Sequence, residues 1–330
     1  MTTPKPILSV ILVTPDTYQR IQRTIQCLRR QTIFDRLEVV IATPNADLRD
    51  ARPADWENFC AVKVVATGPF RNTGHPRAVA AAQASAEVIA FAEDHCFPAA
   101  DWAESLTRLD QLPWAAMSPS LQNANPGAVS WADFLLNFGP AIAPTDARVS
   151  SYTPWHNTAY RRSLLCGYGE RLEYMLEAEI RLQQDLLDRG HQLYLAAGIR
   201  ADHVNISRWK SFLLGQYFGG RIYGAARAES SRWTPWKRVI YAFSAPLIPF
   251  VRFPRVLADA RRTRPSGQEA RFLLACACGL VASALGESVG YLLGAGAAGH
   301  RRITFEFERD RHVAQADLAL LHPETAAAAP

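Results

Sequence analysis

The sequence lacks the cysteine spacing of a disulfide-stapled or zinc-bound protein. Its six cysteines form no Cys-x-x-Cys pair and are scattered along the chain, at Cys27, Cys60, Cys96, Cys166, Cys276 and Cys278. A structural zinc site is therefore not expected. No signal-peptide pattern precedes the first apolar run, because Lys5 is the sole charge in residues 1–8. These absences predict reduced thiols in a cytosolic compartment.

The sequence also lacks a block of like charge. Its 36 Lys and Arg residues exceed its 31 Asp and Glu residues by five, and the basic residues are spread along the chain. This mild positive charge suits an anionic partner such as a nucleotide diphosphate or a lipid surface, and nucleic acid fits less well. With 330 residues, 48% of them apolar, the chain can form one large domain or one domain with an appendage.

Short apolar runs alternate with helical patterns over the first 110 residues. Four runs rich in Val, Ile and Ala have the length of buried parallel strands: residues 7–13, 37–42, 62–66 and 87–92. One apolar stripe over residues 16–31 and an Ala-rich stretch over 76–86 predict helices between them. This alternation predicts an α/β fold with a mainly parallel, doubly wound sheet.

Ligands of such sheets bind at the carboxyl ends of the strands. The loops beginning at Thr14, Thr43, Thr67 and Glu93 should share that edge. Glu93-Asp94-His95 directly follows the fourth run. A divalent cation accepts carboxylate oxygens and, when it is Mn²⁺ or a similar metal, imidazole as well. The alternative is a solvated turn with a helix-capping acid.

Over residues 5–110 the sequence resembles glycosyltransferase family 2, the inverting enzymes of the GT-A fold. Three features carry the resemblance in the family's order and at matching spacing. Residues 9–32 are similar to the opening strand and helix, and Gly74-His75-Pro76-Arg77 to the G-x-x-x-A-R-N segment. Residues 91–102 are similar to the strand that ends in an Asp-x-Asp metal motif. The resemblance implies a GT-A fold, a nucleotide-diphosphate sugar as donor, and Mn²⁺ or Mg²⁺ as cofactor.

The resemblance also implies roles for single residues. His95 stands at the metal-binding last position of the motif, and His203 matches a histidine that GT-A enzymes often add to the metal site. The expected metal ligands are Asp94, His95 and His203, and the expected donor-binding residues are Thr14, Thr43, Arg77, Glu93 and Asp94. The sequence departs from the family in two places. Glu93 and His95 stand where two aspartates are usual, which leaves the metal unassigned. The region of Thr43 lacks the Asp that usually ends the second strand and contacts the base, which leaves the nucleotide unassigned.

A strong helical pattern covers residues 172–189. Glu179 lies inside its apolar face, whereas Glu177 projects to the polar side. Desolvation makes a carboxylate a stronger base, so a buried glutamate suits proton abstraction. The family has an acidic pair in this region, and counting back from Gly190 aligns its second acid, the catalytic base, with Glu179. The alternative is a core glutamate paired to an arginine.

Other features concern the acceptor. Trp155-His156-Asn157 resembles the acceptor-side turn that precedes the base helix, and tryptophan stacks well on sugar faces. The alternative for Trp155 is an ordinary core or interface residue. For His203, after a short strand over residues 192–196, the alternative is a surface histidine.

The composition changes after residue 231, which predicts two domains, 1–231 and 232–330. Residues 236–256 are apolar, proline-interrupted and flanked by Lys and Arg, a pattern suited to the lipid headgroup layer. Residues 272–299 carry Glu287 as their sole charge and are long enough to cross a bilayer. Their glycines recur every fourth residue, which suits close helix packing. A membrane helix and a soluble helical hairpin both remain open.

The sequence thus predicts an inverting glycosyltransferase at the cytoplasmic face of a membrane. Its acceptor would be a saccharide or a lipid-linked hydroxyl, in cell-surface polysaccharide or glycolipid synthesis. The alternative is a catalytically silent GT-A module that binds a nucleotide sugar or scaffolds a membrane polysaccharide assembly. The departures at Thr43 and His95 keep this alternative open.

Overall fold

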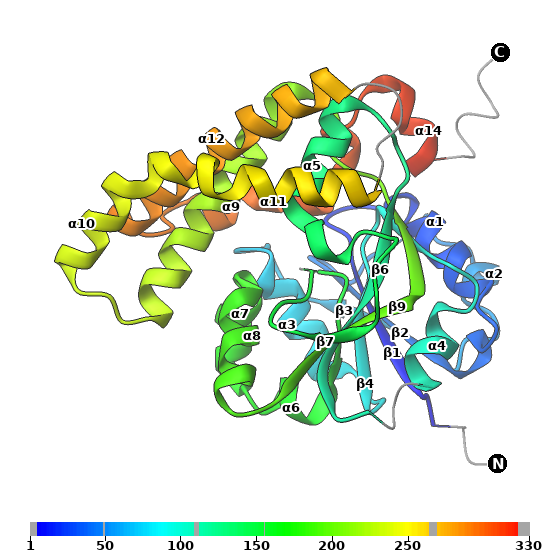
Figure 1. Cartoon of the computed structure of the whole chain (residues 1–330). Coiled ribbons are helices and arrows are strands. Elements are labelled where there is room, and N and C mark those ends of the chain that lie inside the picture. The colour runs from blue at the N-terminus through cyan, green and yellow to red at the C-terminus, as the bar shows by residue number, and fades with distance from the viewer. Residues whose placement is uncertain (1–4, 49, 109–111, 155, 264–268, 323–330) are drawn as a thin grey trace.

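The computed structural model describes residues 5–48, 50–108, 112–154, 156–263 and 269–322. Within these ranges a nine-stranded sheet forms the centre of the molecule, and helices cover it (Figure 1). The strands are β1 (Leu8–Val13), β2 (Leu37–Thr43), β3 (Ala61–Ala66), β4 (Val88–Phe91), β5 (Cys96–Pro98), β6 (Trp114–Asn123), β7 (Arg148–Ser150), β8 (Ala159–Arg161) and β9 (Gln192–His203).

The N-terminal half of the sheet is parallel, as the alternating pattern predicts. β1 pairs with β2 and β4, and β3 lies outside β2. The whole sheet is mixed, in the order β3-β2-β1-β4-β8-β6-β9-β5 with β7 beside β9. β8 is antiparallel to β4 and β6, and β5 and β7 are antiparallel to β9. A mainly parallel sheet was therefore the wrong expectation. Four residues separate β4 from β5 and reverse the chain, whereas parallel strands need a long crossover.

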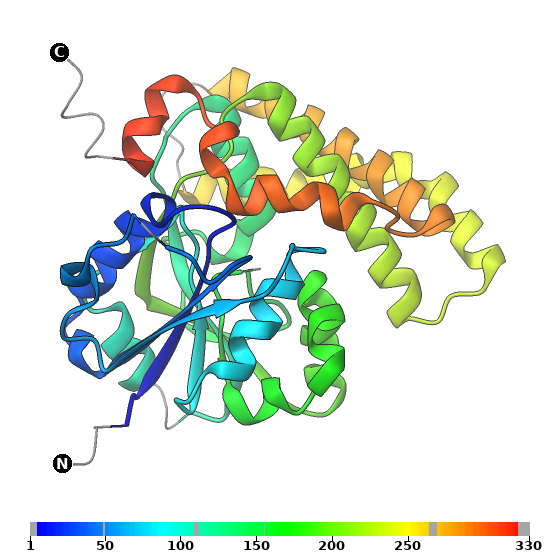
Figure 2. The ribbon, with the colours of Figure 1, turned by 180° about the vertical axis from the view of Figure 1, so that it is seen from behind.

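Alternate residues of the central strands bury against helices on opposite faces. Val10 and Leu12 of β1 pack with α1 (Tyr18–Arg29) and α4 (Trp102–Arg108), whereas Ile11 and Val13 face the other helices. That second layer consists of α3 (Gly74–Gln83), α6 (Arg162–Cys166), α7 (Leu172–Glu177) and α8 (Glu179–Asp188). Figure 2 shows it from behind. Because both faces are covered, the strands read as continuous apolar runs.

The helix predicted over residues 172–189 is broken at Ala178. This residue has φ −137° and ψ 89°, which ends α7 and lets α8 begin at Glu179. The close approach of α3 accompanies the break, because a Cβ at Gly74 would lie 2.4 Å from the backbone N of Glu177. Ala178 packs into a cluster with Ile222 of a later helix. Glu179 therefore opens a new helix with its side chain fully buried.

The C-terminal part forms a helical arm that projects from the sheet, with α10 at its far end (Figure 1). Its long helices are α9 (Trp209–Ser230), α10 (Pro235–Ser244), α11 (Ile248–Thr263) and α12 (Glu269–Leu293), and α5 (Ala128–Phe138) packs against α12 near the sheet. A short turn at Ala245–Leu247 separates α10 from α11, so residues 236–256 form no straight helix, as predicted. The arm includes α9, which precedes the predicted boundary at 231; the division into two domains stays a prediction.

The glycines of α12 pack against another helix of the same chain, α9. A Cβ at Gly286 would lie 2.0 Å from the carbonyl oxygen of Tyr217, and one at Gly290 would lie 2.2 Å from that of Arg221. The backbones of α9 and α12 therefore touch along this face. By length and composition, residues Arg271–Leu293 could cross a membrane, but half of the most apolar window is buried within the protein.

The chain then returns to the sheet. Helix α13 (Ala298–Phe307), orange-red in Figure 2, runs between the arm and the carboxyl edge of the sheet. A turn at Arg309–Arg311 follows it, and α14 (Leu318–Leu321) ends the described chain near α1. This return places Glu306 and Arg309 beside the ends of β4 and β9.

Candidate active site

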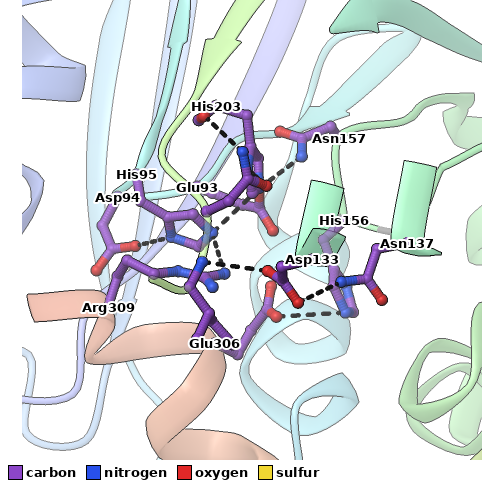
Figure 3. A network of polar contacts seen from close by, with 12 residues as sticks. Glu93, Asp94, His95, Asp133, Asn137, His156, Asn157, His203, Glu306 and Arg309 are labelled. Atoms are coloured by element: carbon purple, nitrogen blue, oxygen red, sulfur yellow. Dashed lines mark hydrogen bonds and ion pairs between the residues drawn. The ribbon is translucent and has the colours of Figure 1, made fainter. Parts of the chain in front are cut away.

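The Glu93-Asp94-His95 turn lies at the carboxyl edge of the sheet, between β4 and β5. In the antiparallel β5–β9 pair, Cys96 lies opposite His203. This register brings the His95 and His203 rings together, with centres 4.9 Å apart and planes at 80° (Figure 3). His203 is the last residue of a twelve-residue strand, so the short strand expected over residues 192–196 was too short.

Three of these side chains can share a cation. Ligand atoms of Glu93, His95 and His203 lie within 4.8 Å of one another, and all three residues are buried. Asp94 instead contacts Nδ1 of His95, and Asn205 lies 2.8 Å from Nδ1 of His203. When each Nδ1 donates to its partner, both Nε2 atoms keep a lone pair directed into the group, as in metal sites. The structure thus groups Glu93, rather than Asp94, with the two histidines.

Burial sets the charge of this group. Desolvation, with the Arg309 guanidinium nearby, lowers the pKa of His203 to about 3 and that of His95 well below its usual value. Both rings are therefore neutral at physiological pH, as metal ligation requires. Desolvation also raises the pKa of Glu93 to about 7, with the Glu306 carboxylate adding to the effect. The buried Nε2 of His203 has no hydrogen-bond partner.

Two charged residues from the C-terminal return complete the site. Nη2 of Arg309 lies 2.5 Å from Nε2 of His95, so the guanidinium uses the lone pair that a cation would need. Glu306 accepts from Nη2 of Arg77 at 2.6 Å, with both side chains almost fully buried. Despite burial, His156 and Arg77 hold the pKa of Glu306 well below its usual value. Sequence reasoning missed Glu306 and Arg309; the charged stretch 301–311 was their only signal.

Glu179 is held on both carboxylate oxygens. Oε1 accepts the backbone N–H of His156 at 2.9 Å and lies 3.1 Å from Nδ1 of that ring, while Oε2 accepts the Tyr160 hydroxyl at 2.9 Å. Nε2 of His156 lies 3.6 Å from a carboxylate oxygen of Glu306. His156 has φ 70°, a left-handed conformation that costs free energy outside glycine. His156 therefore connects Glu179 to the charged group at the sheet edge.

Glu177 has different surroundings. Its carboxylate lies 3.6 Å from Nη1 of Arg181 and retains about a fifth of its side-chain exposure. A Cβ at Gly299, at the start of α13, would lie 2.2 Å from Oε1 of Glu177. Burial raises the pKa of Glu177, and Arg181 opposes this effect. The structure thus brings Glu179 next to His156. It shows no contact between Glu177 and His156 in the described residues.

Of the other expected site residues, those that the structure describes lie at or near the same edge. Thr43 ends β2, and the N–H of Thr14 donates to the carbonyl of Ala42 at 3.0 Å, so the two threonines are neighbours. Nδ2 of Asn157 donates to Glu93 and so contacts the cation group. Arg77 is already paired with Glu306. Trp155 lies outside the described residues. The donor, acceptor, metal and base roles of all these residues stay predictions.

Another residue missed by sequence reasoning is Asp133 of α5. Its carboxylate accepts the backbone N–H of Ile206 at 3.1 Å and the amide of Gln216 at 3.2 Å. It thereby holds the segment that follows His203. Figure 3 shows Asp133 beside Asn137, whose amide donates to it at 2.9 Å. The apolar pattern of α5 hides this role, because a single acid inside a helix gives no local signal of its partners.

No family model matches the sequence, and no curated protein matches it. Among solved structures, the chain is similar to a mannosyltransferase, PcManGT from Pyrobaculum calidifontis, in complex with GDP-Man and Mn²⁺. The TM-score is 0.54 and the identity 16%, over 86% of this chain and 88% of that one. This likeness confirms the expected GT-A fold.

Two further structures are less similar. S. aureus TarS 1-349 in complex with UDP gives a TM-score of 0.46 at 15% identity, over 82% of this chain and 89% of that one. GalNAc-T7 with UDP, GalNAc and Mn²⁺ gives 0.44 at 13% identity, over 60% of this chain. The match spans 43% of the length of GalNAc-T7.

Proposed function

We propose that this protein is a metal-dependent glycosyltransferase that moves a sugar from a nucleotide-diphosphate sugar to an acceptor hydroxyl with inversion. The observation that carries the proposal is the buried Glu93, His95 and His203 group at the carboxyl edge of a GT-A sheet. That edge is where open α/β sheets bind ligands. The mannosyltransferase of the same fold was solved with GDP-Man and Mn²⁺.

The residues present fit a divalent metal. His203 offers a buried Nε2 without a hydrogen-bond partner, and Glu93 offers a carboxylate oxygen 3.4 Å from that atom. Two imidazole ligands favour Mn²⁺ over Mg²⁺, which prefers oxygen. When bound, the ion would supply positive charge that stabilises the departing nucleotide diphosphate. Because His95 has one Nε2 lone pair, Arg309 must leave it before an ion can bind there.

The proton of the acceptor hydroxyl goes to the Glu179–His156 pair. Both oxygens of Glu179 already accept hydrogen bonds, so Glu179 acts through the ring of His156, whose Nδ1 lies 3.1 Å away. A proton taken at Nε2 of His156 creates an imidazolium that the Glu179 carboxylate stabilises, the logic of a carboxylate-supported histidine. The acceptor oxygen forms a bond to the anomeric carbon as the bond between that carbon and the diphosphate oxygen breaks. This direct displacement inverts the configuration of the anomeric carbon.

Thr14 and Thr43 are proposed to bind the nucleotide, since they lie together at the ends of β1 and β2. Asn157 is proposed to orient Glu93, to which its amide donates. The proposed acceptor is a saccharide or lipid-linked hydroxyl at the cytoplasmic face of a membrane, in cell-surface polysaccharide or glycolipid synthesis. The apolar surface of the helical arm supports this choice.

A catalytically silent nucleotide-sugar-binding module is the second candidate. Two contacts favour it, because Arg309 engages His95 and Glu306 engages Arg77 within the chain. Hydrolysis of a panel of UDP- and GDP-sugars, with Mn²⁺ or with chelator, separates the candidates. We expect Mn²⁺-dependent release of nucleotide diphosphate from one donor, abolished in His203→Ala. Nucleotide binding without Mn²⁺-dependent turnover of any donor would favour the silent module.

A further inference from the structure

The far end of the helical arm exposes a stripe of large apolar side chains. Along α10, the following turn and the start of α11, exposed residues recur at helical spacing. Their exposed fractions range from 46% to 79%, and the residues are Trp236, Ile240, Phe243, Leu247, Phe250 and Val251. Exposed large apolar side chains that gather on one segment, instead of being scattered singly, mark a binding surface. We name these six residues the α10–α11 stripe.

The charged residues of the segment that carries the stripe are of one sign. Residues 231–258 contain five basic residues and no Asp or Glu: Arg232, Lys237, Arg238, Arg252 and Arg255. Arg232, Lys237 and Arg255 are exposed, whereas Arg252 is partly committed to Glu287 of α12 at 3.3 Å. Basic residues beside exposed Trp and Phe match the headgroup layer of an anionic bilayer, which takes apolar rings and attracts cations together.

Among the described residues, the helix that is long and apolar enough to cross a bilayer is α12, and it is already engaged. Its Gly286 and Gly290 lie against the backbone of α9, so α12 could span a bilayer only after leaving α9. Helix α13 begins at Ala298, with four residues between it and the end of α12, and it packs on α9 and carries Glu306 and Arg309 into the candidate site, so a displaced α12 would pull on this packing. The close packing of α12 on α9 therefore favours an α12 that stays within the fold that builds the site.

We infer that the α10–α11 stripe docks on the surface of a bilayer that contains anionic lipid, with the stripe in the headgroup layer and α12 retained on α9. Figure 1 shows α10 at the end of the arm away from the sheet, where a flat surface can reach it. The inference does not depend on sugar transfer, and donor hydrolysis in solution is tested separately.

Vesicle flotation of the full chain tests the inference. The vesicles contain phosphatidylcholine alone or phosphatidylcholine with phosphatidylglycerol. We expect the parent protein to float with the phosphatidylglycerol vesicles and Phe243→Ser/Phe250→Ser to lose at least about tenfold in partition. Val149→Ser removes another exposed apolar side chain, 57% exposed, from β7 and should float like the parent. Arg232→Glu/Arg255→Glu should weaken binding to the vesicles with phosphatidylglycerol and leave binding to phosphatidylcholine vesicles unchanged.

Three results would overturn the inference. The first is equal flotation of the parent and Phe243→Ser/Phe250→Ser, or no flotation of either. The second is a dimer in light scattering that this double variant dissociates, which would assign the stripe to a second copy of the chain. The third is protection of one flank of α12, and not the other, from trypsin added outside the vesicles, which would indicate a spanning helix. Circular dichroism of each variant verifies its fold.

Discussion

The His203 ring lies edge-on to the His95 ring across the β5–β9 pair, with ring centres 4.9 Å apart. Phe138 packs edge-on against the His203 ring at 4.6 Å, and Asn205 holds Nδ1 at 2.8 Å, so the ring has a fixed orientation. The same Nε2 is buried without a hydrogen-bond partner. A buried acceptor without a donor costs free energy, which a ligand at this position would recover.

His203→Ala should therefore lower Mn²⁺ affinity by at least about 10–100-fold, because substitution of residues that only support a metal ligand already causes a loss of this size. The measurement is Mn²⁺ titration by electron paramagnetic resonance, without nucleotide. His191→Ala is the matched control, because His191 is only partly buried and lies before β9, outside the group. An unchanged Mn²⁺ affinity in His203→Ala would contradict the metal assignment.

Arg309→Gln should raise Mn²⁺ affinity by about tenfold or more, since it removes both a competitor for the His95 lone pair and a nearby positive charge. Arg311→Gln is its control, because Arg311 lies in the same turn but is exposed and pairs with Glu308 at 2.7 Å. Calorimetric titration with Mn²⁺ measures both. If Arg309→Gln instead weakens nucleotide binding and leaves Mn²⁺ affinity unchanged, Arg309 is a diphosphate ligand.

The parallel half of the fold could be predicted from the sequence because its signals are local. Observed strands such as Leu8–Val13 and Leu37–Thr43 match the predicted runs 7–13 and 37–42 to within one residue. The antiparallel half could not, because the position of β8 between β4 and β6 depends on pairing between distant segments. The break at Ala178 likewise depends on the close contact of Gly74 with α7.

Some residues of the candidate site could likewise be predicted from the sequence, and others could not. Glu93 and His95 could be located because they end an apolar strand, and His203 because of a family resemblance. Glu306 and Arg309 could not, because they reach the site only after α13 packs against α9 and returns to the sheet edge. Side chains that a distant helix delivers leave no periodic signal of their destination.

Gly286→Ala should destabilise the protein by about 1–3 kcal/mol, the usual cost of overpacking, because the new Cβ would lie 2.0 Å from the carbonyl oxygen of Tyr217. This cost must exceed the gain of up to about 1 kcal/mol that alanine brings to a helix. Gly219→Ala on α9 is the control, since its Cβ would meet the flexible end of Arg302 at 3.3 Å. Urea denaturation measures both; equal stability of the two variants would refute the tight α9–α12 contact.

Acid should weaken the C-terminal return through His312. Burial, with Arg309 nearby, lowers the pKa of His312 to about 4. The neutral ring is therefore favoured in the folded state, and its contribution to stability is complete above the unfolded pKa and is lost as pH falls from about 6.5 towards 4. Between pH 7 and pH 5, His312→Gln should lose about 1 kcal/mol less stability than the parent, allowing for solvent screening. Parallel curves for both proteins would show that His312 does not titrate in this range.

Glu179→Gln is the most direct test of the proton-transfer proposal. Glutamine keeps an oxygen that can accept the backbone N–H of His156 but removes the negative charge beside the ring. Transfer at saturating donor should fall by roughly two to four orders of magnitude, while donor affinity and melting temperature stay near those of the parent.

Glu177→Gln is the internal control, because Glu177 contacts Arg181 and Gly299 but has no contact with His156 in the described structure. It should change turnover little. A glutamate that only supported the fold would behave differently, since Glu179→Gln would then lower the melting temperature and leave turnover per folded molecule the same. Should turnover collapse in Glu177→Gln and persist in Glu179→Gln, proton transfer runs through the earlier acid, and the contact between Glu179 and His156 serves only to hold a strained backbone.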